Sequence, residues 1–321
     1  IDNNARKFFF GKDGDITWVK RKLKKDLNNY QHLNIDIRNF TKLEKIFKKY
    51  KKNIKVIIHA AAQPSHDWAY KNPHLDFKIN AEGTLNLLEN TKKYSSKAVF
   101  IFLSTNKVYG DGPNKIKYLN LNSRFELKKK HKYFNGINEN FSIDNCVHSL
   151  FGVSKSYADL ICQEYGKNLK LSVGIFRAGC ITGPKHKGAK LHGFLSYLVK
   201  TIIRGKKYNI IGYGGKQVRD NIHSKDLIRC FWEFYKKPKK GEVYNIGGGR
   251  FSNCSVLEAI RIVENKLNFK AKTKKIKRNR IGDHKWYISD TSKFKKHYPK
   301  WKQTYNVKKI INEIINEEKQ N

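Results

Sequence analysis

Short apolar runs alternate with helical patterns through the first half of the chain. Three runs resemble buried strands, at residues 56–60, 98–103 and 171–176. Each is short, apolar and rich in β-branched or aromatic residues, as is usual for parallel strands covered on both faces. Apolar positions recur at helical spacing over 81–94 and 151–167. This alternation predicts a doubly wound α/β fold with a parallel sheet and right-handed crossovers.

The second half is less regular and contains no internal repeat. Its patterns predict helices near 191–204, 224–236, 255–267 and 306–318, and strands near 208–212 and 243–246. We expect one Rossmann-type domain over residues 1–180 and a smaller α/β region over 181–321. Residues 213–249 are expected to return to the first domain.

Composition narrows the possible functions. The 321 residues, 39% of them hydrophobic, are enough for a substantial core. No run of about 18 apolar residues occurs, so no membrane span is expected. Five cysteines without CxxC spacing argue against a disulfide framework and against a zinc site, and favour a reducing cytoplasm.

The net charge of +40 raises the possibility of nucleic-acid binding. However, only 12 of the 67 basic residues are arginine, and the 55 lysines are spread along the whole chain. Planar recognition of bases and phosphates favours arginine. We therefore interpret the charge as a solvated surface that helps to attract an anionic substrate, and we expect no specific nucleic-acid partner.

Small and polar residues follow each predicted strand. They occupy 60–63, 104–110 and 177–184. Ligands of such folds bind at the carboxyl ends of the strands, where small residues allow close approach, although tight packing explains them equally well. Lys155 lies four residues after Phe151, which places both side chains on one helix face. The ammonium of Lys155 could bind the hydroxyls of a ribose. The simpler alternative is that Lys155 is an ordinary charged residue of the surface.

Four motifs, taken together and in this order, carry a family resemblance. They are Ser104 to Gly110 (Ser-Ser/Thr-x-x-Val-Tyr-Gly), 219–227 (Arg-Asp-x-x-His-x-x-Asp-Leu), 245–249 (Asn-Ile/Leu-Gly-Gly-Gly) and 280–283 (Arg-x-Gly-Asp). The chain resembles the extended short-chain dehydrogenase/reductases, and within them the NAD-dependent nucleotide-sugar epimerases and dehydratases. The resemblance implies that residues 1–180 form the NAD-binding Rossmann domain and that 181–321 mainly bind substrate.

A closer resemblance points to one branch of that family. It is carried by the runs 62–68, 104–109, 191–195, 215–220 and 248–255. It implies an epimerase that inverts C2 of a CDP-linked dideoxyhexose, for the O-antigen of lipopolysaccharide. The implied reaction is transient oxidation by NAD to a keto sugar, followed by re-reduction from the other face.

The resemblance also implies roles for individual residues. The implied catalytic positions are Thr105, Lys155 and Phe151. The implied cofactor-binding residues are Asp2, Asn3, Arg6, Asp36, Ile37, Ala60, Ala61, Ala62, Asn80, Leu103, Ser104, Lys155 and Arg177. The implied substrate-binding residues are Gln63, His66, Thr105, Cys180, His192, Arg219, Arg280 and Asp283. The two arginines are expected on the nucleotide diphosphate, whose oxygens suit the guanidinium fork. No metal is expected.

Two departures from the family pattern stand out. The glycine-rich turn that binds the cofactor pyrophosphate is absent from the sequence, and we expect a strand, this turn and a helix upstream of Ile1. The family's Tyr-x-x-x-Lys pair reads Phe151 to Lys155, and phenylalanine has no proton to exchange. Candidate replacements are His66, Asp67, His148 and Cys180, or Lys155 acting with a water.

Other readings stay open. The chain could be a nucleotide-sugar dehydratase or reductase, although Asn106-Lys107 after Thr105 lacks the acidic pair that a dehydratase commonly has there. It could also be an inactive homologue that binds NAD or a nucleotide sugar, as Phe151 suggests. A homodimer is expected because many relatives of the resembled family pair through two helices.

Overall fold

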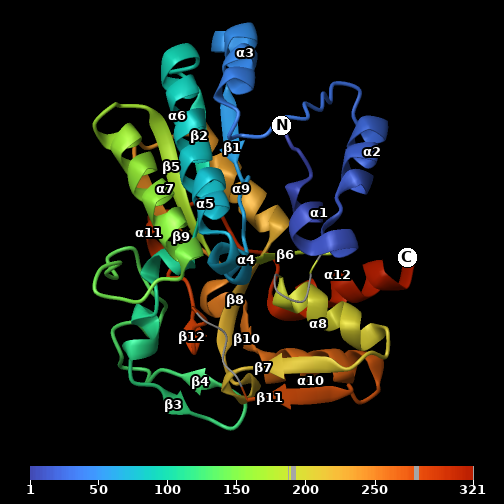
Figure 1. Ribbon diagram of the computed structural model, residues 1–321. Helices are drawn as coiled ribbons and strands as arrows, with labels where there is room; N and C mark the ends of the chain where they lie inside the picture. The colour runs from blue at the N-terminus through green and yellow to red at the C-terminus, as the bar shows by residue number, and fades with distance from the viewer. Residues whose placement is uncertain (187, 189–192, 278–281, 321) are drawn as a thin grey trace. The chain divides into compact units, whose positions relative to one another are not determined.

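The structure is a computed structural model that describes residues 1–186, 188, 193–277 and 282–320 (Figure 1). Its helices are α1 (Ala5–Phe10), α2 (Thr17–Asp26), α3 (Phe40–Tyr50), α4 (His66–Lys71), α5 (Pro73–Phe77), α6 (Gly83–Tyr94), α7 (Leu150–Lys167), α8 (Phe194–Ile203), α9 (Ser224–Lys236), α10 (Val256–Leu267), α11 (Ser292–His297) and α12 (Val307–Gln320). Its strands are β1 (Val56–His59), β2 (Val99–Thr105), β3 (Leu119–Asn120), β4 (Phe125–Glu126), β5 (Ser172–Ala178), β6 (Cys180–Thr182), β7 (Tyr208–Ile211), β8 (Val218–His223), β9 (Glu242–Ile246), β10 (Asn253–Ser255), β11 (Thr273–Ile276) and β12 (Trp286–Tyr287).

The main sheet has the strand order β1-β2-β5-β9. β1 and β2 pair in parallel, with Val56 opposite Val99 and His59 opposite Phe102. The side chains of Phe100, Ile101 and Phe102 are fully buried, as expected for a strand covered on both faces. The predicted α/β class with helices between parallel strands is therefore confirmed.

Most predicted elements are present with ends shifted by a few residues. The three strands of the first half appear as β1, β2 and β5, and the two helical patterns as α6 and α7. The helices and strands predicted for the second half appear as α8, β7, α9, β9, α10 and α12. Where the predicted helix near 191–204 starts cannot be compared in full, since 191 and 192 lie outside the described residues.

A single π-helical turn, Lys78–Glu82, joins α5 to α6. π-turns insert an extra residue into a helix and often accompany functional sites. This one carries Asn80, whose side chain is 1% exposed. The predicted helix at 81–94 thus starts inside the π-turn, and its α-helical part begins at Gly83.

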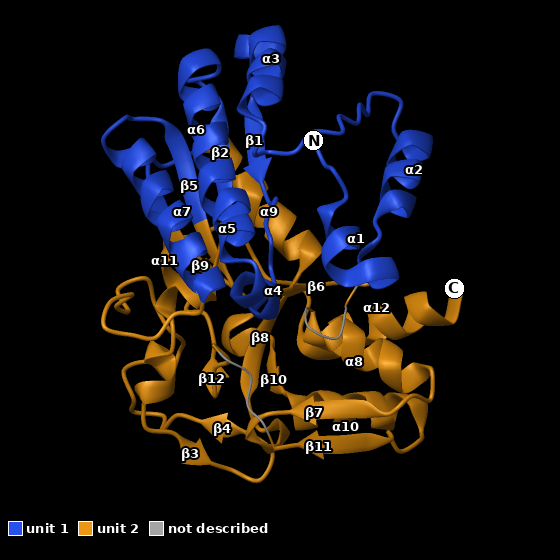
Figure 2. Cartoon of the chain, viewed as in Figure 1, with its two compact units in different colours: residues 1–103, 150–175, 238–242 blue, residues 104–149, 176–237, 243–321 orange. Residues whose placement is uncertain are grey.

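By contacts, the chain divides into two compact units, which Figure 2 colours separately. Unit 1 comprises 1–103, 150–175 and 238–242, and unit 2 comprises 104–149, 176–237 and 243–321. The division passes through β2, β5 and β9. These are units of packing, so the predicted division into a cofactor and a substrate domain stays a prediction.

Unit 2 has its own core and further small sheets. β8 pairs with β10, β12 and β6, and β7 pairs in parallel with β11. Buried aliphatic residues of α8, α10 and α12 pack with β7 in one cluster, which includes Leu198, Ile260 and Ile314. A second cluster surrounds Tyr109, Trp286 and Tyr287.

Within the described ranges, no helix combines the length and apolarity that a membrane crossing needs. All five cysteines are free thiols. No group of three or more His, Cys, Asp or Glu side chains in the described part of the chain is arranged to hold a metal ion.

Candidate active site

In unit 1, helix α7 carries two of the three predicted catalytic positions, one turn apart. Phe151 is 7% exposed and Lys155 is 4% exposed. Lys155 Nζ donates a 3.0 Å hydrogen bond to the carbonyl oxygen of Leu103, near the end of β2. The same ammonium lies 4.1 Å from the centre of the Phe102 ring. The helix therefore holds its lysine against the carboxyl end of a central strand.

Burial controls the charge of this lysine. Desolvation lowers the pKa of Lys155 to about 8, while the charges of Cys162, Asp159 and Asp76 act in the opposite direction. A lysine with such a pKa exists partly as the neutral amine near physiological pH, and that form can accept a proton.

The Phe151 ring meets the ring of His66, the first residue of α4. Their centroids lie 5.1 Å apart and their planes are 71° from parallel, an edge-to-face contact. Phe151 itself offers no hydroxyl. An imidazole therefore stands beside the ring that replaces the family's tyrosine.

A network of buried polar groups fixes α4 and α7 relative to each other. Gln63 Nε2 donates to Asp76 Oδ1 at 2.7 Å and to the carbonyl of Ser65 at 2.9 Å. The backbone N–H of Gln63 donates to Asn80 Oδ1 at 2.9 Å. Asn80 Nδ2 reaches Ser154 Oγ on α7 at 3.1 Å, and that hydroxyl donates to the Phe151 carbonyl. Since all these groups are buried, their geometry is strongly constrained.

Asp76 and Ser154 belong to this network, and sequence reasoning missed both. Asp76 is 2% exposed, and burial raises its pKa, against hydrogen bonds from Ser154 and Gln63 and the charge of Lys155. The useful sequence signal would have been an acidic residue at a helical start, after Pro73, in a stretch that the fold buries. Gln63 and Asn80, both predicted from the resemblance, lie together here.

The residues implied for the adenosine end also come together in unit 1. Asn3 Nδ2 donates to Asp36 Oδ2 at 3.0 Å, and the Arg38 guanidinium forms an ion pair with the same carboxylate at 2.7 Å. The Arg38 hydrogen bond is the largest cause of the lowered pKa of Asp36. Asp2 Oδ1 accepts from the N–H of Asn4 at 2.6 Å. Ile37 is buried against Gly83, where an added Cβ would lie 2.6 Å from Ile37 Cδ1.

These features suit part of a dinucleotide. Ala60 and Ala61 follow β1 directly and are exposed, so a ligand can approach their backbone without meeting a large side chain. The carboxylate of Asp2 accepts a hydrogen bond from the N–H of Asn4, and the carboxylate of Asp36 accepts one from Asn3. The two carboxylates are therefore held by adjacent residues. Arg6 lies over the Phe10 ring at 5.1 Å, and burial lowers its pKa. The residues present therefore fit an adenosine ribose and the part of the cofactor next to it.

In unit 2, Thr105 ends β2 and caps the 3₁₀ turn Asn106–Tyr109. Its hydroxyl accepts from the N–H of Lys107 at 3.2 Å, and Ser104 beside it is buried. The turn directs Tyr109 inwards, where its hydroxyl donates to Asn245 Oδ1 at 2.8 Å and accepts from Arg177 Nη1 at 3.1 Å. Two of the motifs, 104–110 and 245–249, thus meet the stretch 177–184 through Tyr109, Arg177 and Asn245, an arrangement that packs the fold.

Arg219 on β8 pairs with the carboxylate of Asp283 through Nη2. Its Nη1 donates to the Val218 carbonyl at 2.7 Å, and the side chain is buried. Burial raises the pKa of the nearby Cys180 thiol to about 11, with Arg219 acting against it. The structure therefore brings three predicted substrate residues together. His192 and Arg280, predicted for the same role, lie outside the described residues.

Asp220, the next residue of the motif, holds distant segments of the fold together. Its buried Oδ2 accepts from the N–H groups of Gly249 and Ser289, at 3.1 and 2.9 Å. Gly247 and Gly179 face the carboxylate so closely that a Cβ on either would collide with it. The carboxylate thus connects 219–227, 245–249 and 177–184, which are far apart in sequence.

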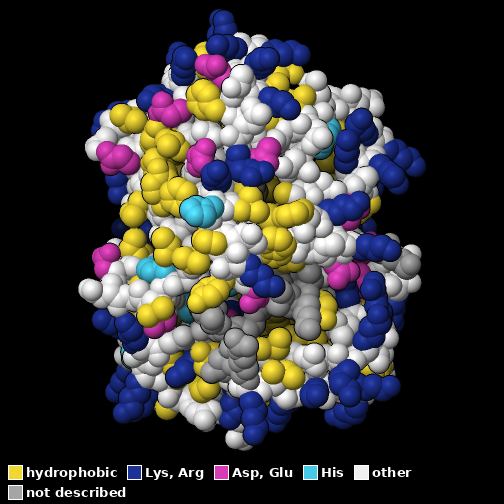
Figure 3. Space-filling model, viewed as in Figure 1, with side chains coloured by type: hydrophobic (Ala, Val, Ile, Leu, Met, Phe, Trp, Pro, Cys, Tyr) yellow, Lys and Arg dark blue, Asp and Glu magenta, His cyan; other side chains and the backbone are white. Residues whose placement is uncertain are grey.

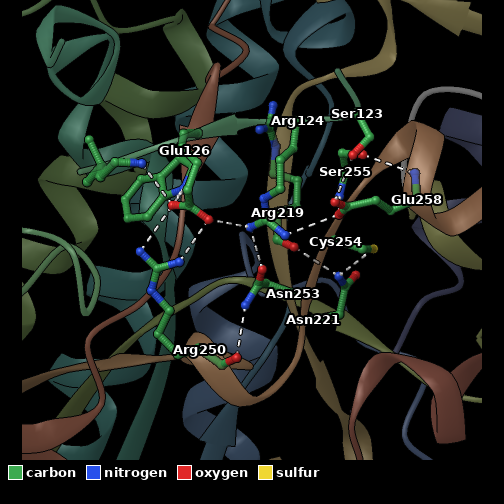
Figure 4. A network of polar contacts seen from close by, with 12 residues as sticks. Ser123, Arg124, Glu126, Arg219, Asn221, Arg250, Asn253, Cys254, Ser255 and Glu258 are labelled. Carbon is green, nitrogen blue, oxygen red and sulfur yellow. Dashed lines mark hydrogen bonds and ion pairs between the residues drawn. The ribbon is translucent and has the colours of Figure 1, made fainter. Parts of the chain in front are cut away.

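Figure 4 shows a charged network that explains the run 248–255. Arg250 forms two hydrogen bonds to Glu126, at 3.0 and 3.1 Å, and Arg124 bridges Glu126 and Glu258 at 3.0 and 3.2 Å. Ser255 caps α10 in a reciprocal box with Glu258. These contacts tie β4 and β10 to helix α10, and sequence reasoning missed all three charges outside the run.

Comparisons with known proteins show which family the chain is similar to. The profile described as "NAD dependent epimerase/dehydratase family" matches residues 5–247. The chain is 30% identical over 300 residues to CDP-paratose 2-epimerase of Salmonella typhi, covering 91% of this chain and 83% of that protein. It is 33% identical over 219 residues to dTDP-D-glucose 4,6-dehydratase of Dictyostelium discoideum, covering 68% of this chain and 46% of that protein.

A solved structure agrees as well. A Tyr-to-Phe variant of UDP-glucuronic acid 4-epimerase from Bacillus cereus, in complex with UDP-4-deoxy-4-fluoro-glucuronic acid and NAD, superimposes with a TM-score of 0.73 at 25% identity. The match covers 95% of this chain and 86% of that one. The profile match spans most of the chain. The chain therefore belongs to the NAD-dependent epimerase/dehydratase family.

Proposed function

We propose that this protein is an NAD-dependent epimerase of a nucleotide-linked sugar, similar to CDP-paratose 2-epimerase. The observation that carries the proposal is the position of Lys155, whose buried ammonium is held 3.0 Å from the Leu103 carbonyl beside the end of β2. The 30% identity to CDP-paratose 2-epimerase over 91% of this chain supports a related substrate class, a CDP-linked dideoxyhexose of lipopolysaccharide O-antigen.

The proposed roles follow the chemistry of each side chain. NAD, when bound, accepts and returns the hydrogen of one sugar carbon. Asp2, Asn3 and Asp36 hold the adenosine end, and Ala60 and Ala61 admit the rest of the cofactor. Lys155, on α7, donates to ribose hydroxyls beside the end of β2. Thr105 donates to the reacting sugar hydroxyl, and Arg219 neutralises the diphosphate.

A dehydratase is the second enzymatic candidate, favoured by the 33% identity to dTDP-D-glucose 4,6-dehydratase. Elimination of water needs an acid and a base beside the keto sugar. Neither of the two residues after Thr105 carries a carboxylate. Asn106 is a buried amide, and Lys107 Nζ donates to the Gly282 carbonyl at 2.8 Å. This observation favours the epimerase.

An inactive binding protein is the third candidate, favoured by Phe151. In the solved Bacillus cereus structure, a variant that has lost a tyrosine hydroxyl is still complexed with a nucleotide sugar and NAD. Binding both ligands is thus compatible with one missing hydroxyl in a relative. Turnover separates this candidate from the epimerase.

We also propose that two copies of the chain pair through one face of unit 1. Exposed apolar side chains gather on α5 and α7, namely Phe77, Val153, Tyr157 and Leu160, and Phe77 and Tyr157 are in ring contact at 5.7 Å. Figure 3 shows hydrophobic side chains concentrated over these helices at the upper left. With a net charge of +40, the lysine-rich remainder of the surface repels a second copy. An exposed apolar face is where two copies can meet.

The test of the proposed function uses the purified protein. NAD-loaded protein is mixed with CDP-, dTDP- and UDP-linked sugars, and the products are separated and identified by NMR. An epimerase gives a sugar inverted at one carbon without net consumption of NAD. Lys155→Ala and Thr105→Ala should each abolish this turnover, whereas Lys78→Ala, at an exposed lysine of the π-turn, should leave it unchanged.

A further inference from the structure

The missing tyrosine hydroxyl raises the question of which group exchanges the proton of the sugar hydroxyl. In unit 1, the ring of Phe151 is in edge-to-face contact with one titratable ring, that of His66 at 5.1 Å between centroids. An imidazole ordinarily has a pKa near neutrality and can take and return a proton at that pH. His66 is also partly exposed, so it can reach a ligand.

The other candidate groups suit the task less well. Lys155 Nζ is committed to the Leu103 carbonyl and the face of Phe102. The Asp76 carboxylate receives hydrogen bonds from Gln63 and Asn80 and is fully buried. His148 lies in unit 2, where its Nε2 is hydrogen-bonded to the Val108 carbonyl at 2.7 Å. Burial raises the pKa of Cys180, which disfavours its thiolate at neutral pH.

The position of His66 is set by the surrounding structure. Ser65 directly before it caps α4, accepting from the N–H of Trp68 at 3.3 Å. The N–H of Ser65 donates to Gln63 Oε1 at 2.5 Å, and Gln63 is joined through Asn80 to Ser154 on α7. Buried, mutually bonded groups thus lead from the residue before His66 to the turn that carries Phe151. Proton transfer requires such a fixed geometry.

We propose that His66 is the proton carrier of this enzyme, in place of the phenol that Phe151 lacks. The inference rests on the proposed epimerase function and assigns its acid/base group. As the O–H bond of the sugar hydroxyl breaks, its proton bonds to an imidazole nitrogen. The C–H bond of the same carbon breaks, its hydrogen leaves with the electron pair to the bound nicotinamide, and a C=O bond forms. The imidazolium returns its proton to the oxygen when the hydrogen comes back to the opposite face.

The test compares His66→Gln with His74→Gln, which alters an exposed histidine on α5 of the same unit. General acid/base groups contribute about 10²–10⁴-fold to a rate. His66→Gln should therefore slow transient reduction of the bound nicotinamide by about 10²-fold or more, with the Kd for the nucleotide sugar and the melting temperature unchanged. His74→Gln should match the wild type. Adding Phe151→Tyr to His66→Gln should restore much of the lost rate, because the phenol is supplied again.

A second readout is independent of turnover. Diethyl pyrocarbonate modifies accessible imidazoles, and mass spectrometry reports each histidine separately. A saturating nucleotide sugar should slow modification of His66 and leave that of His74 unchanged. Equal rates with and without the sugar would remove His66 from the ligand site and overturn the inference.

The remaining outcomes separate the inference from the proposed function. If His66→Gln turns over like the wild type, or loses binding and rate in equal measure, His66 does not carry the proton. If the wild type is inactive and Phe151→Tyr is active, the site stands but the inference fails. If neither protein reduces nicotinamide with any nucleotide sugar, the proposed function and the inference fall together.

Discussion

The side-chain nitrogen of Lys155 and the carbonyl oxygen of Leu103 are joined by a 3.0 Å hydrogen bond inside unit 1. Burial there lowers the pKa of Lys155 from 10.5 to about 8. Below about pH 8 the folded protein holds a buried ammonium, which costs stability. Between about pH 8 and pH 10.5 the unfolded chain binds the extra proton, so this contribution to stability rises with pH.

We therefore predict that the stability difference between Lys155→Met and the wild type depends on pH. Replacing the ammonium removes a cost of at most about 3 kcal/mol near neutrality. The advantage of the variant should shrink as the pH is raised through about 8 towards 10. Urea unfolding at several pH values measures it, with Lys78→Met at an exposed lysine as the control. A difference that stays constant or grows would contradict the burial-lowered pKa.

The pair of Arg219 and Asp283 leads to a prediction about binding. If Arg219 holds the nucleotide diphosphate, Arg219→Ala should weaken nucleotide-sugar binding at least tenfold, the effect of losing about 1.4 kcal/mol, and leave NAD binding unchanged. Asp283→Asn removes the ion pair but keeps the guanidinium, so it should weaken binding of the sugar nucleotide less than Arg219→Ala does.

Calorimetric titration with CDP and with NAD separates the possibilities. Equal losses of both affinities in Arg219→Ala would show that the arginine has been assigned to the wrong ligand. A lowered melting temperature with intact binding would show that the ion pair with Asp283 serves the fold alone.

The network around Asn80 predicts a stability effect. Asn80→Ala removes the acceptor for the Gln63 N–H and a donor to Asp76 and Ser154, all of them buried. Leaving buried polar groups without partners costs about 1–3 kcal/mol each. Chemical unfolding should show a loss in this range or above. Asn168→Ala, at an exposed asparagine after α7, should change stability little, and an equally mild Asn80→Ala would refute the importance of the network.

The apolar face of unit 1 predicts an oligomeric state. Leu160→Glu places a charge at one end of the exposed row Val153, Tyr157 and Leu160 on α7. Two copies would then bury two like charges, so the variant should be monomeric in sedimentation or light-scattering measurements while the wild type is a dimer. Leu169→Glu, at an exposed leucine outside this row, is the control. A monomeric wild type would contradict the proposed pairing.

The spacing of apolar residues was sufficient to predict the elements whose buried side chains are mostly apolar. β2 is apolar from Val99 to Leu103 because both faces are covered, and the strand was predicted within two residues of its ends. α6 was harder, because the π-turn before it preserves hydrophobic spacing while shifting the register by one residue. β8 was missed as a strand, since Val218–His223 reads as mostly polar. Its polar side chains are buried because Arg219, Asp220 and His223 find partners from distant segments.

The same limit applies to the site. The family pattern pointed to Lys155, Thr105 and Arg219 because each stands in a recognisable local motif. Asp76 and Ser154 have no such pattern, and only the fold brings them to Gln63 and Asn80. The contact between His66 and Phe151 spans 85 residues of sequence and depends on α4 packing against α7. No spacing rule predicts a contact of that kind.

The most direct test of the account is a single-turnover experiment on the NAD-loaded protein with a CDP-linked dideoxyhexose. The absorbance of the bound nicotinamide is followed in a stopped-flow instrument, and the sugar is recovered and examined by NMR. The account predicts a transient rise in reduced nicotinamide that decays as a sugar inverted at one carbon appears, with all the NAD returned to its oxidised form. Recovery of the sugar unchanged, with no transient reduction in either the wild type or Phe151→Tyr, would contradict it.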